Sequence, residues 1–88
     1  AAAFHSPLVA DAAEPFRAAL DGVPLPPADL PVFANTTAAP YPADPAAARD
    51  LLGNQLALPV AFAAEVRAML AAGVRTFVEV GPGAVLTR

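Results

Sequence analysis

The sequence has no cysteine and no lysine, and its five basic residues are all arginine. Without cysteine, the chain has no disulfide framework, no thiolate metal ligand and no cysteine nucleophile. The eight acidic residues give a net charge of −3, and no basic cluster is present, so we expect neither nucleic acid nor an anionic membrane as a partner. The acidic residues are spread out rather than clustered, so we expect no metal site.

Long hydrophobic runs are also absent. No apolar run approaches the roughly 18 residues of a membrane span. The first residues show neither a charged leader nor a cleavage pattern, so we expect a cytoplasmic protein without a signal peptide. Hydrophobic residues make up 57% of the chain, but 24 of the 88 residues are alanine, whose methyl group buries little area. The composition therefore argues against a self-sufficient core and favours a piece of a larger domain.

Three segments carry apolar residues at the three- and four-residue spacings that are typical of amphipathic helices. We expect helices over residues 11–20, 44–56 and 60–72. We predict that Asp11 caps the first helix and that Gly22, in a left-handed conformation, ends it. Asp44 and Pro45 form a strong start signal for the second, with a capping carboxylate followed by proline at the first helical position. Gly73 should end the third helix.

Two short runs rich in β-branched and aromatic residues, Val32–Ala34 and Thr76–Val80, predict strands. The prolines of Val23–Pro31 predict an extended connector. Gly81–Gly83 is read as a turn, and Ala84–Arg88 as the start of another helix. The alternation of helices and strands favours an α/β fold with parallel strands flanked by helices. Two strands do not make an independent sheet, so further strands are expected from elsewhere.

His5 is the only histidine and the only side chain whose unperturbed pKa lies near neutrality. A lone histidine usually has no catalytic role. Ser6 is the only serine, but adjacent residues project in divergent directions, and no G-x-S-x-G elbow is present, so a hydrolase built on these two residues is disfavoured. Glu79 is expected to bond to backbone N–H groups, and Glu65 to lie on a solvated face. The residues alone thus indicate part of a soluble α/β protein.

Three motifs occur in order along the chain. They read A-F-H-S-P-L at residues 3–8, Q-L-x-x-P-V-x-F at residues 55–62, and V-x-x-F-x-E-V-G-P-G-x-V-L-T at residues 74–87. Together they resemble the acyltransferase domains, of malonyl-CoA:acyl carrier protein transacylase type, of polyketide synthases. The form A-A-F-H at residues 2–5 is closer to iterative enediyne or polyunsaturated-fatty-acid synthases. The resemblance covers the whole chain.

The resemblance implies that residues 1–88 form the C-terminal part of an α/β-hydrolase-like large subdomain. The family transfers a malonyl-type acyl group from coenzyme A to the phosphopantetheine thiol of an acyl carrier protein, through an acyl-serine, in antibiotic or fatty acid biosynthesis. Its nucleophile lies in an upstream G-H-S-x-G elbow that is not in this chain, so the segment alone is expected to be inactive. The implied partners are the upstream part of the domain, the carrier protein and neighbouring synthase domains. Coenzyme A thioester is the substrate, and no bound cofactor is implied.

The resemblance also implies roles for single residues. His5 matches the general base, and the main-chain carbonyl of Gln55 matches the acceptor that orients it. Phe4 matches the bulky position of the family's H-A-F-H tetrad, which here reads Ala2-Ala3-Phe4-His5 with alanine in place of the first histidine. A phenyl ring leaves little room for a methyl branch, so malonyl is the implied substrate. The alternative is a non-catalytic scaffold or docking module within a synthase.

Overall fold

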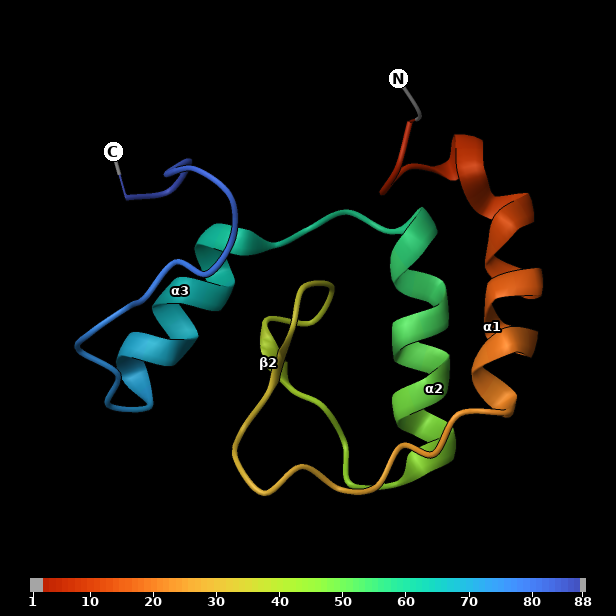
Figure 1. Cartoon of the computed structure of the whole chain (residues 1–88), viewed down its shortest axis with the longest axis horizontal. Helices are drawn as coiled ribbons and strands as arrows, with labels where there is room; N and C mark the ends of the chain where they lie inside the picture. The colour runs from red at the N-terminus through yellow and green to blue at the C-terminus, as the bar shows by residue number, and fades with distance from the viewer. Residues whose placement is uncertain (1–2, 88) are drawn as a thin grey trace.

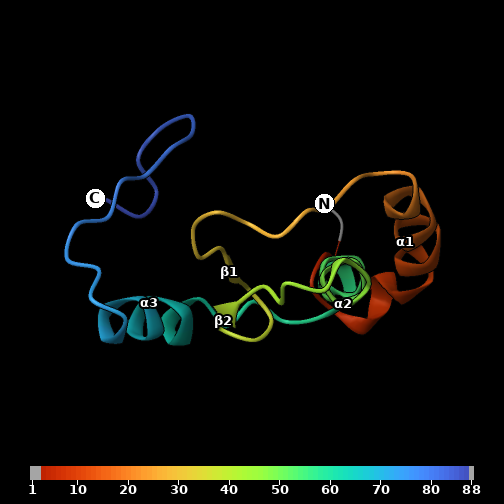
Figure 2. The same ribbon diagram turned by 90° about the horizontal axis from the view of Figure 1, so that it is seen from below.

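The computed structural model describes residues 3–87. The elements follow in the order η1 (a 3-10 helix, Pro7–Ala12), α1 (Ala13–Asp21), β1 (Phe33–Ala34), β2 (Ala39–Pro40), α2 (Pro45–Asn54), η2 (3-10, Gln55–Ala57) and α3 (Phe62–Ala71). Figures 1 and 2 both show α1 beside α2, with the β1–β2 hairpin between α2 and α3. Among the described residues, no helix has the length and apolar character needed to cross a membrane.

The first helical segment begins earlier than expected. Ser6 is extended and its hydroxyl accepts the Leu8 N–H at 3.3 Å, which starts η1. The chain is already helical at Ala12, and α1 has no side-chain cap, so the predicted cap at Asp11 is wrong. At the other end, Gly22 has φ −85° and not the expected left-handed conformation, because the chain continues with a right-handed turn.

The second helix confirms its start signal. The Asp44 carboxylate accepts the Ala47 N–H at 3.0 Å, and Pro45 occupies the first helical position. Gly53 lies buried where α1 crosses α2. A Cβ there would lie 3.0 Å from Cδ and 3.2 Å from Cβ of Arg17, so the glycine permits close packing of the two helices.

Polar contacts also hold α1 against α2. Arg17 donates from Nε to the Asp50 carboxylate at 2.7 Å and from Nη1 to Asp21. Arg49 of α2 donates to the carbonyl of Leu20 at 3.2 Å and to that of Val23 at 2.9 Å. The end of α1 and the beginning of the connector are therefore fixed to α2.

The predicted strand at Val32–Ala34 is present as β1, in which Ala34 is only 1% exposed. It pairs with β2 in antiparallel register, Phe33 opposite Pro40 and Ala34 opposite Ala39. The expected parallel sheet is not confirmed, since this hairpin is the whole sheet within the described part of the chain. The Asn35 carbonyl accepts the Ala61 N–H at 2.7 Å, which joins the hairpin to α3.

The C-terminal segment differs from the sequence-based expectation. Neither the strand predicted at Thr76–Val80 nor the helix predicted from Ala84 is found up to residue 87, so both predictions are wrong for this structure. A strand needs a neighbour to pair its N–H and C=O groups, and no described strand lies against this segment. Val80 is consequently 93% exposed. The N–H groups of residues 85–87 bond to the Glu79 carboxylate, and the chain forms a bend there rather than a helical turn.

Glu79 confirms its expected role. Its carboxylate accepts the N–H groups of Val85 at 2.9 Å, Leu86 at 3.1 Å and Thr87 at 3.1 Å. Gly81 and Gly83 have φ of 156° and 77°, so the chain reverses direction as the predicted turn requires. The third helix likewise ends as expected, at Gly73 with φ 105°.

The apolar core is small. Leu20 and Ala34 are the buried hydrophobic residues of the described part of the chain, whereas Leu8, Val78 and other large apolar side chains are exposed. This agrees with a composition in which alanine supplies nearly half of the hydrophobic residues. Burial of this extent contributes little hydrophobic stabilisation.

Candidate functional site

His5 is held by two successive carbonyl groups. Its ring Nδ1 lies 3.0 Å from the Gln55 carbonyl oxygen, and its main-chain N–H donates to the Leu56 carbonyl at 2.8 Å. Both acceptors belong to η2, the 3-10 turn that follows α2. Residues 50 positions apart in the sequence therefore meet in one small site.

The backbone of His5 shows how strongly the site is constrained. Its φ is 62°, in the left-handed region that costs a non-glycine residue about 1–3 kcal/mol. The Leu56 bond offsets part of this cost. The Gln55 carbonyl also accepts the Leu58 N–H at 3.2 Å, a second bond within η2.

The chemistry of this pair follows from what each atom can do. A carbonyl oxygen only accepts, so its bond to the ring requires the proton on Nδ1. In the neutral imidazole, the lone pair is then on Nε2. The ring is exposed, so a group outside this chain can reach Nε2. The arrangement suits a general base whose tautomer is fixed by a neutral acceptor.

Ser6 uses its hydroxyl for local bonds. It donates to the Ala3 carbonyl at 2.6 Å and accepts the Leu8 N–H at 3.3 Å. Both are turn contacts at the entry to η1, and neither involves the imidazole. Ser6 is thus the residue that caps the start of η1.

The residues before His5 are at the surface. Phe4 is 60% exposed, and Ala3 is exposed as well. Ala2 lies outside the described residues. Phe4 is therefore next to His5 in the chain, with its ring open to contact by another surface.

Tyr41 is a site residue that the sequence did not point to. Its hydroxyl donates to the side-chain oxygen Oε1 of Gln55 at 3.1 Å. Tyr41 is half-buried, and burial, with the charge of Glu65 as a smaller cause, raises its pKa above 10.0. Two sequence features could have pointed to Tyr41: it is the only tyrosine, and it stands between Pro40 and Pro42.

No family model matches the chain, but several characterised proteins do. The Malonyl CoA-acyl carrier protein transacylase of Bacillus subtilis is 39% identical over 84 residues, covering 96% of this chain. A polyunsaturated fatty acid synthase of Thraustochytrium is 38% identical over 88 residues, covering 98%. Polyketide biosynthesis protein PksE of Bacillus subtilis is 34% identical over 85 residues, covering 97%.

The chain belongs to the family of these acyltransferases. It matches a C-terminal portion of their acyltransferase region. It spans 26% of the length of the Bacillus transacylase, 3% of the Thraustochytrium protein and 11% of PksE.

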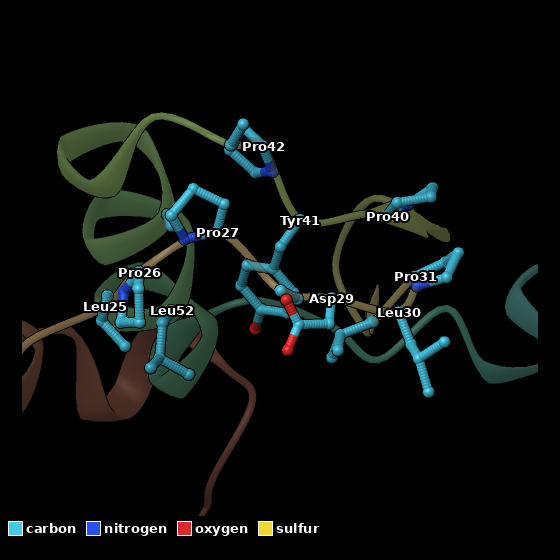
Figure 3. Close-up of a pocket in the computed structure, with 14 residues that line it drawn as sticks. Leu25, Pro26, Pro27, Asp29, Leu30, Pro31, Pro40, Tyr41, Pro42 and Leu52 are labelled. Atoms are coloured by element: carbon cyan, nitrogen blue, oxygen red, sulfur yellow. The ribbon is translucent and has the colours of Figure 1, made fainter.

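A cavity of about 640 Å³, with Tyr41 in its wall, lies in this acyltransferase segment. Figure 3 shows its wall, formed mainly by the connector before β1 and the loop between β2 and α2. Prolines and leucines line it, together with Asp29, its one charged residue. Tyr41 is thus both a wall of the cavity and the neighbour of Gln55.

Glu65 does not lie on a solvated face, contrary to the expectation. It is 6% exposed, because the first turn of α3 is joined to the hairpin by the Ala61–Asn35 bond. Its oxygen Oε2 has no hydrogen-bond partner among the described residues. Within residues 3–87 of the acyltransferase segment, no group of three or more histidines and acids is placed to hold a metal ion.

Proposed function

We propose that this acyltransferase segment supplies the general base for transfer of a malonyl-type acyl group from coenzyme A to the phosphopantetheine thiol of an acyl carrier protein. The observation that carries the proposal is the 3.0 Å contact between His5 Nδ1 and the Gln55 carbonyl. The names of the relatives include a malonyl-CoA–acyl carrier protein transacylase and a fatty acid synthase, which support the reaction class.

The proposed chemistry has two symmetrical half-reactions. Nε2 of His5 takes the proton of a serine hydroxyl from the rest of the domain while that oxygen attacks the thioester carbonyl. The coenzyme A thiolate leaves and takes the proton from the imidazolium. The carrier-protein thiol then gives its proton to Nε2, attacks the acyl-serine and receives the acyl group, and the imidazolium returns the proton to the serine oxygen.

The Gln55 carbonyl performs the orienting task of the aspartate in serine-protease triads. It fixes the ring so that Nε2 remains the basic atom in both half-reactions. A neutral acceptor stabilises the imidazolium less than a carboxylate does, so the proton is returned more readily to the leaving group. The coenzyme A thioester enters as substrate, and no bound cofactor takes part.

The proposal extends to the partners, the compartment and the completed sheet. The upstream part of the domain supplies the serine elbow, and the carrier protein and neighbouring synthase domains are the partners, in the cytoplasm. Thr76–Val80 becomes a strand of a parallel, α/β-hydrolase-like sheet when the rest of the domain pairs with it. Its exposed Val78 and Val80 support this, since β-branched residues fit a covered pleated surface.

The test is substitution of His5 in the complete acyltransferase domain. His5→Ala should slow self-acylation from malonyl-CoA by about 10²–10⁴-fold, the range for loss of a general base. Ser6→Asn is the matched control, because asparagine also caps helices but has no hydroxyl to act as a nucleophile. It should acylate at close to the wild-type rate. Near-normal acylation by His5→Ala would remove His5 from the mechanism and favour the scaffold alternative.

Phe4 is proposed to favour malonyl over branched units. It directly precedes His5, and its phenyl ring occupies space that an α-methyl group needs. Phe4→Ser should raise methylmalonyl transfer relative to malonyl transfer, measured by competition between the two coenzyme A esters. An unchanged ratio would place the specificity pocket elsewhere.

A further inference from the structure

Two hydrogen bonds connect Tyr41 to His5 through a single residue. The Tyr41 hydroxyl donates to the Gln55 side chain at 3.1 Å, and the Gln55 carbonyl lies 3.0 Å from His5 Nδ1. Gln55 stands at the junction where α2 ends and η2 begins. The Gln55 side chain therefore bonds to Tyr41, and the Gln55 carbonyl bonds to His5.

Tyr41 is well suited to fix a neighbour. Its main-chain N–H donates to the Val32 carbonyl at 2.8 Å, which continues the hairpin. Pro40 and Pro42 flank it, and a proline ring fixes φ near −65°. Its ring forms part of the cavity wall (Figure 3). The phenol is therefore attached to a rigid stretch of backbone.

The protonation state of Tyr41 fits a donor. Burial, and secondarily the charge of the buried Glu65, raise the pKa of the phenol. The hydroxyl therefore keeps its proton throughout the neutral range. The Gln55 oxygen Oε1 can only accept, so the direction of the bond is fixed from Tyr41 to Gln55.

We propose that Tyr41 is a positioning residue for His5: its hydroxyl holds the Gln55 side chain and thereby directs the Gln55 carbonyl at the imidazole. This inference rests on the proposed role of His5 as general base. Without the tyrosine bond, the Gln55 residue can turn at the α2–η2 junction, and the carbonyl spends less time in line with Nδ1. A net hydrogen bond of ordinary strength corresponds to a loss of about three- to tenfold in acylation rate.

The test is a double-mutant cycle in the complete domain, with single-turnover acylation from malonyl-CoA as the readout. Tyr41→Phe keeps the ring in the cavity wall and removes only the hydroxyl. Gln55→Met keeps the main-chain carbonyl and the volume of the side chain and removes only the amide. Each should lower the acylation rate about three- to tenfold and leave KM for malonyl-CoA unchanged. The double variant should be no slower than either single variant, because all three lack the same bond.

Several results would overturn the inference while leaving the proposed function intact. One is a wild-type rate for Tyr41→Phe in a domain whose His5→Ala variant is inactive. Another is a loss in Tyr41→Phe that is absent from Gln55→Met, since Tyr41 would then act through the cavity wall. A third is a double variant whose fold-loss in acylation rate equals the product of the two single fold-losses. If His5→Ala itself is active, the proposed function fails first.

Discussion

Replacing Gly53 by alanine inserts a methyl group where α1 crosses α2. The new Cβ would lie 3.0 Å from Cδ, 3.2 Å from Cβ and 3.5 Å from Cα of Arg17. The first of these atoms belongs to a flexible side chain and can move, but the other two are tied to the α1 backbone. Accommodating the methyl group therefore requires the helices to separate.

Two opposing effects set the magnitude. Alanine stabilises a helix interior by about 1 kcal/mol relative to glycine, whereas overpacking costs about 1–3 kcal/mol. We expect Gly53→Ala to lower the free energy of unfolding by up to about 2 kcal/mol. The rate of acylation should fall as well, since Gly53 is two residues before Gln55 and a shifted α2 displaces the acceptor for His5.

Gly22 provides the matched control. It has φ −85°, a conformation that alanine adopts freely, and the nearest atom to its added Cβ is the Ala19 carbonyl oxygen at 3.9 Å. Gly22→Ala should stabilise the protein by about 0.4–1 kcal/mol through the unfolded state. Urea unfolding of both variants, followed by circular dichroism in the complete domain, measures the contrast. The reasoning is refuted if Gly53→Ala stabilises the domain as much as Gly22→Ala does.

Two further predictions concern carboxylates that accept backbone N–H groups. Hydrogen bonds from the Thr87 hydroxyl, and then from the Val85 and Leu86 N–H groups, lower the pKa of Glu79 below 4.5. The carboxylate therefore stabilises the C-terminal turn fully above pH 4.5, and this stabilisation is lost as the pH falls through the lower folded pKa. Amide exchange at residues 85–87, corrected for its intrinsic pH dependence, should show protection falling only on that acidic side, and Glu79→Gln should abolish the pH dependence. If protection in the wild type instead changes between about pH 6 and 8, where a glutamate does not titrate, this account is contradicted. Asp44→Ala should lower the free energy of unfolding by about 1 kcal/mol through loss of the cap, whereas Asp44→Asn should lose little; equal losses in thermal unfolding would assign the effect to charge.

Signals confined to a few neighbouring residues predicted structure well. Asp44 and Pro45 placed the start of α2, and Glu79 was correctly expected to bond to nearby N–H groups. The Asp11 cap failed, because η1 already leads the chain into α1 in a helical conformation.

Features that depend on distant neighbours could not be predicted in this way. Gly53 gives no local signal of its role, which becomes visible only when Arg17 lies against it. Tyr41 acquires its role from a side chain 14 residues away. Thr76–Val80 has strand-forming residues, but a strand exists only when another backbone pairs with it. His5 was identified through a family resemblance, since its acceptor lies beyond the range of any local pattern.

The 50-residue separation of His5 and Gln55 has a consequence for folding. Closing a loop of that length costs chain entropy of about 3.5 kcal/mol, and one hydrogen bond does not offset it. The packing of α1 on α2, with the Arg49 bonds to Leu20 and Val23, must hold the loop closed. A chain whose helices have formed but have not docked would therefore contain an imidazole with no fixed tautomer. Helices as short as α1 and α2 are marginal before they dock, so we expect the orientation of the base and the packed helices to be lost together on unfolding.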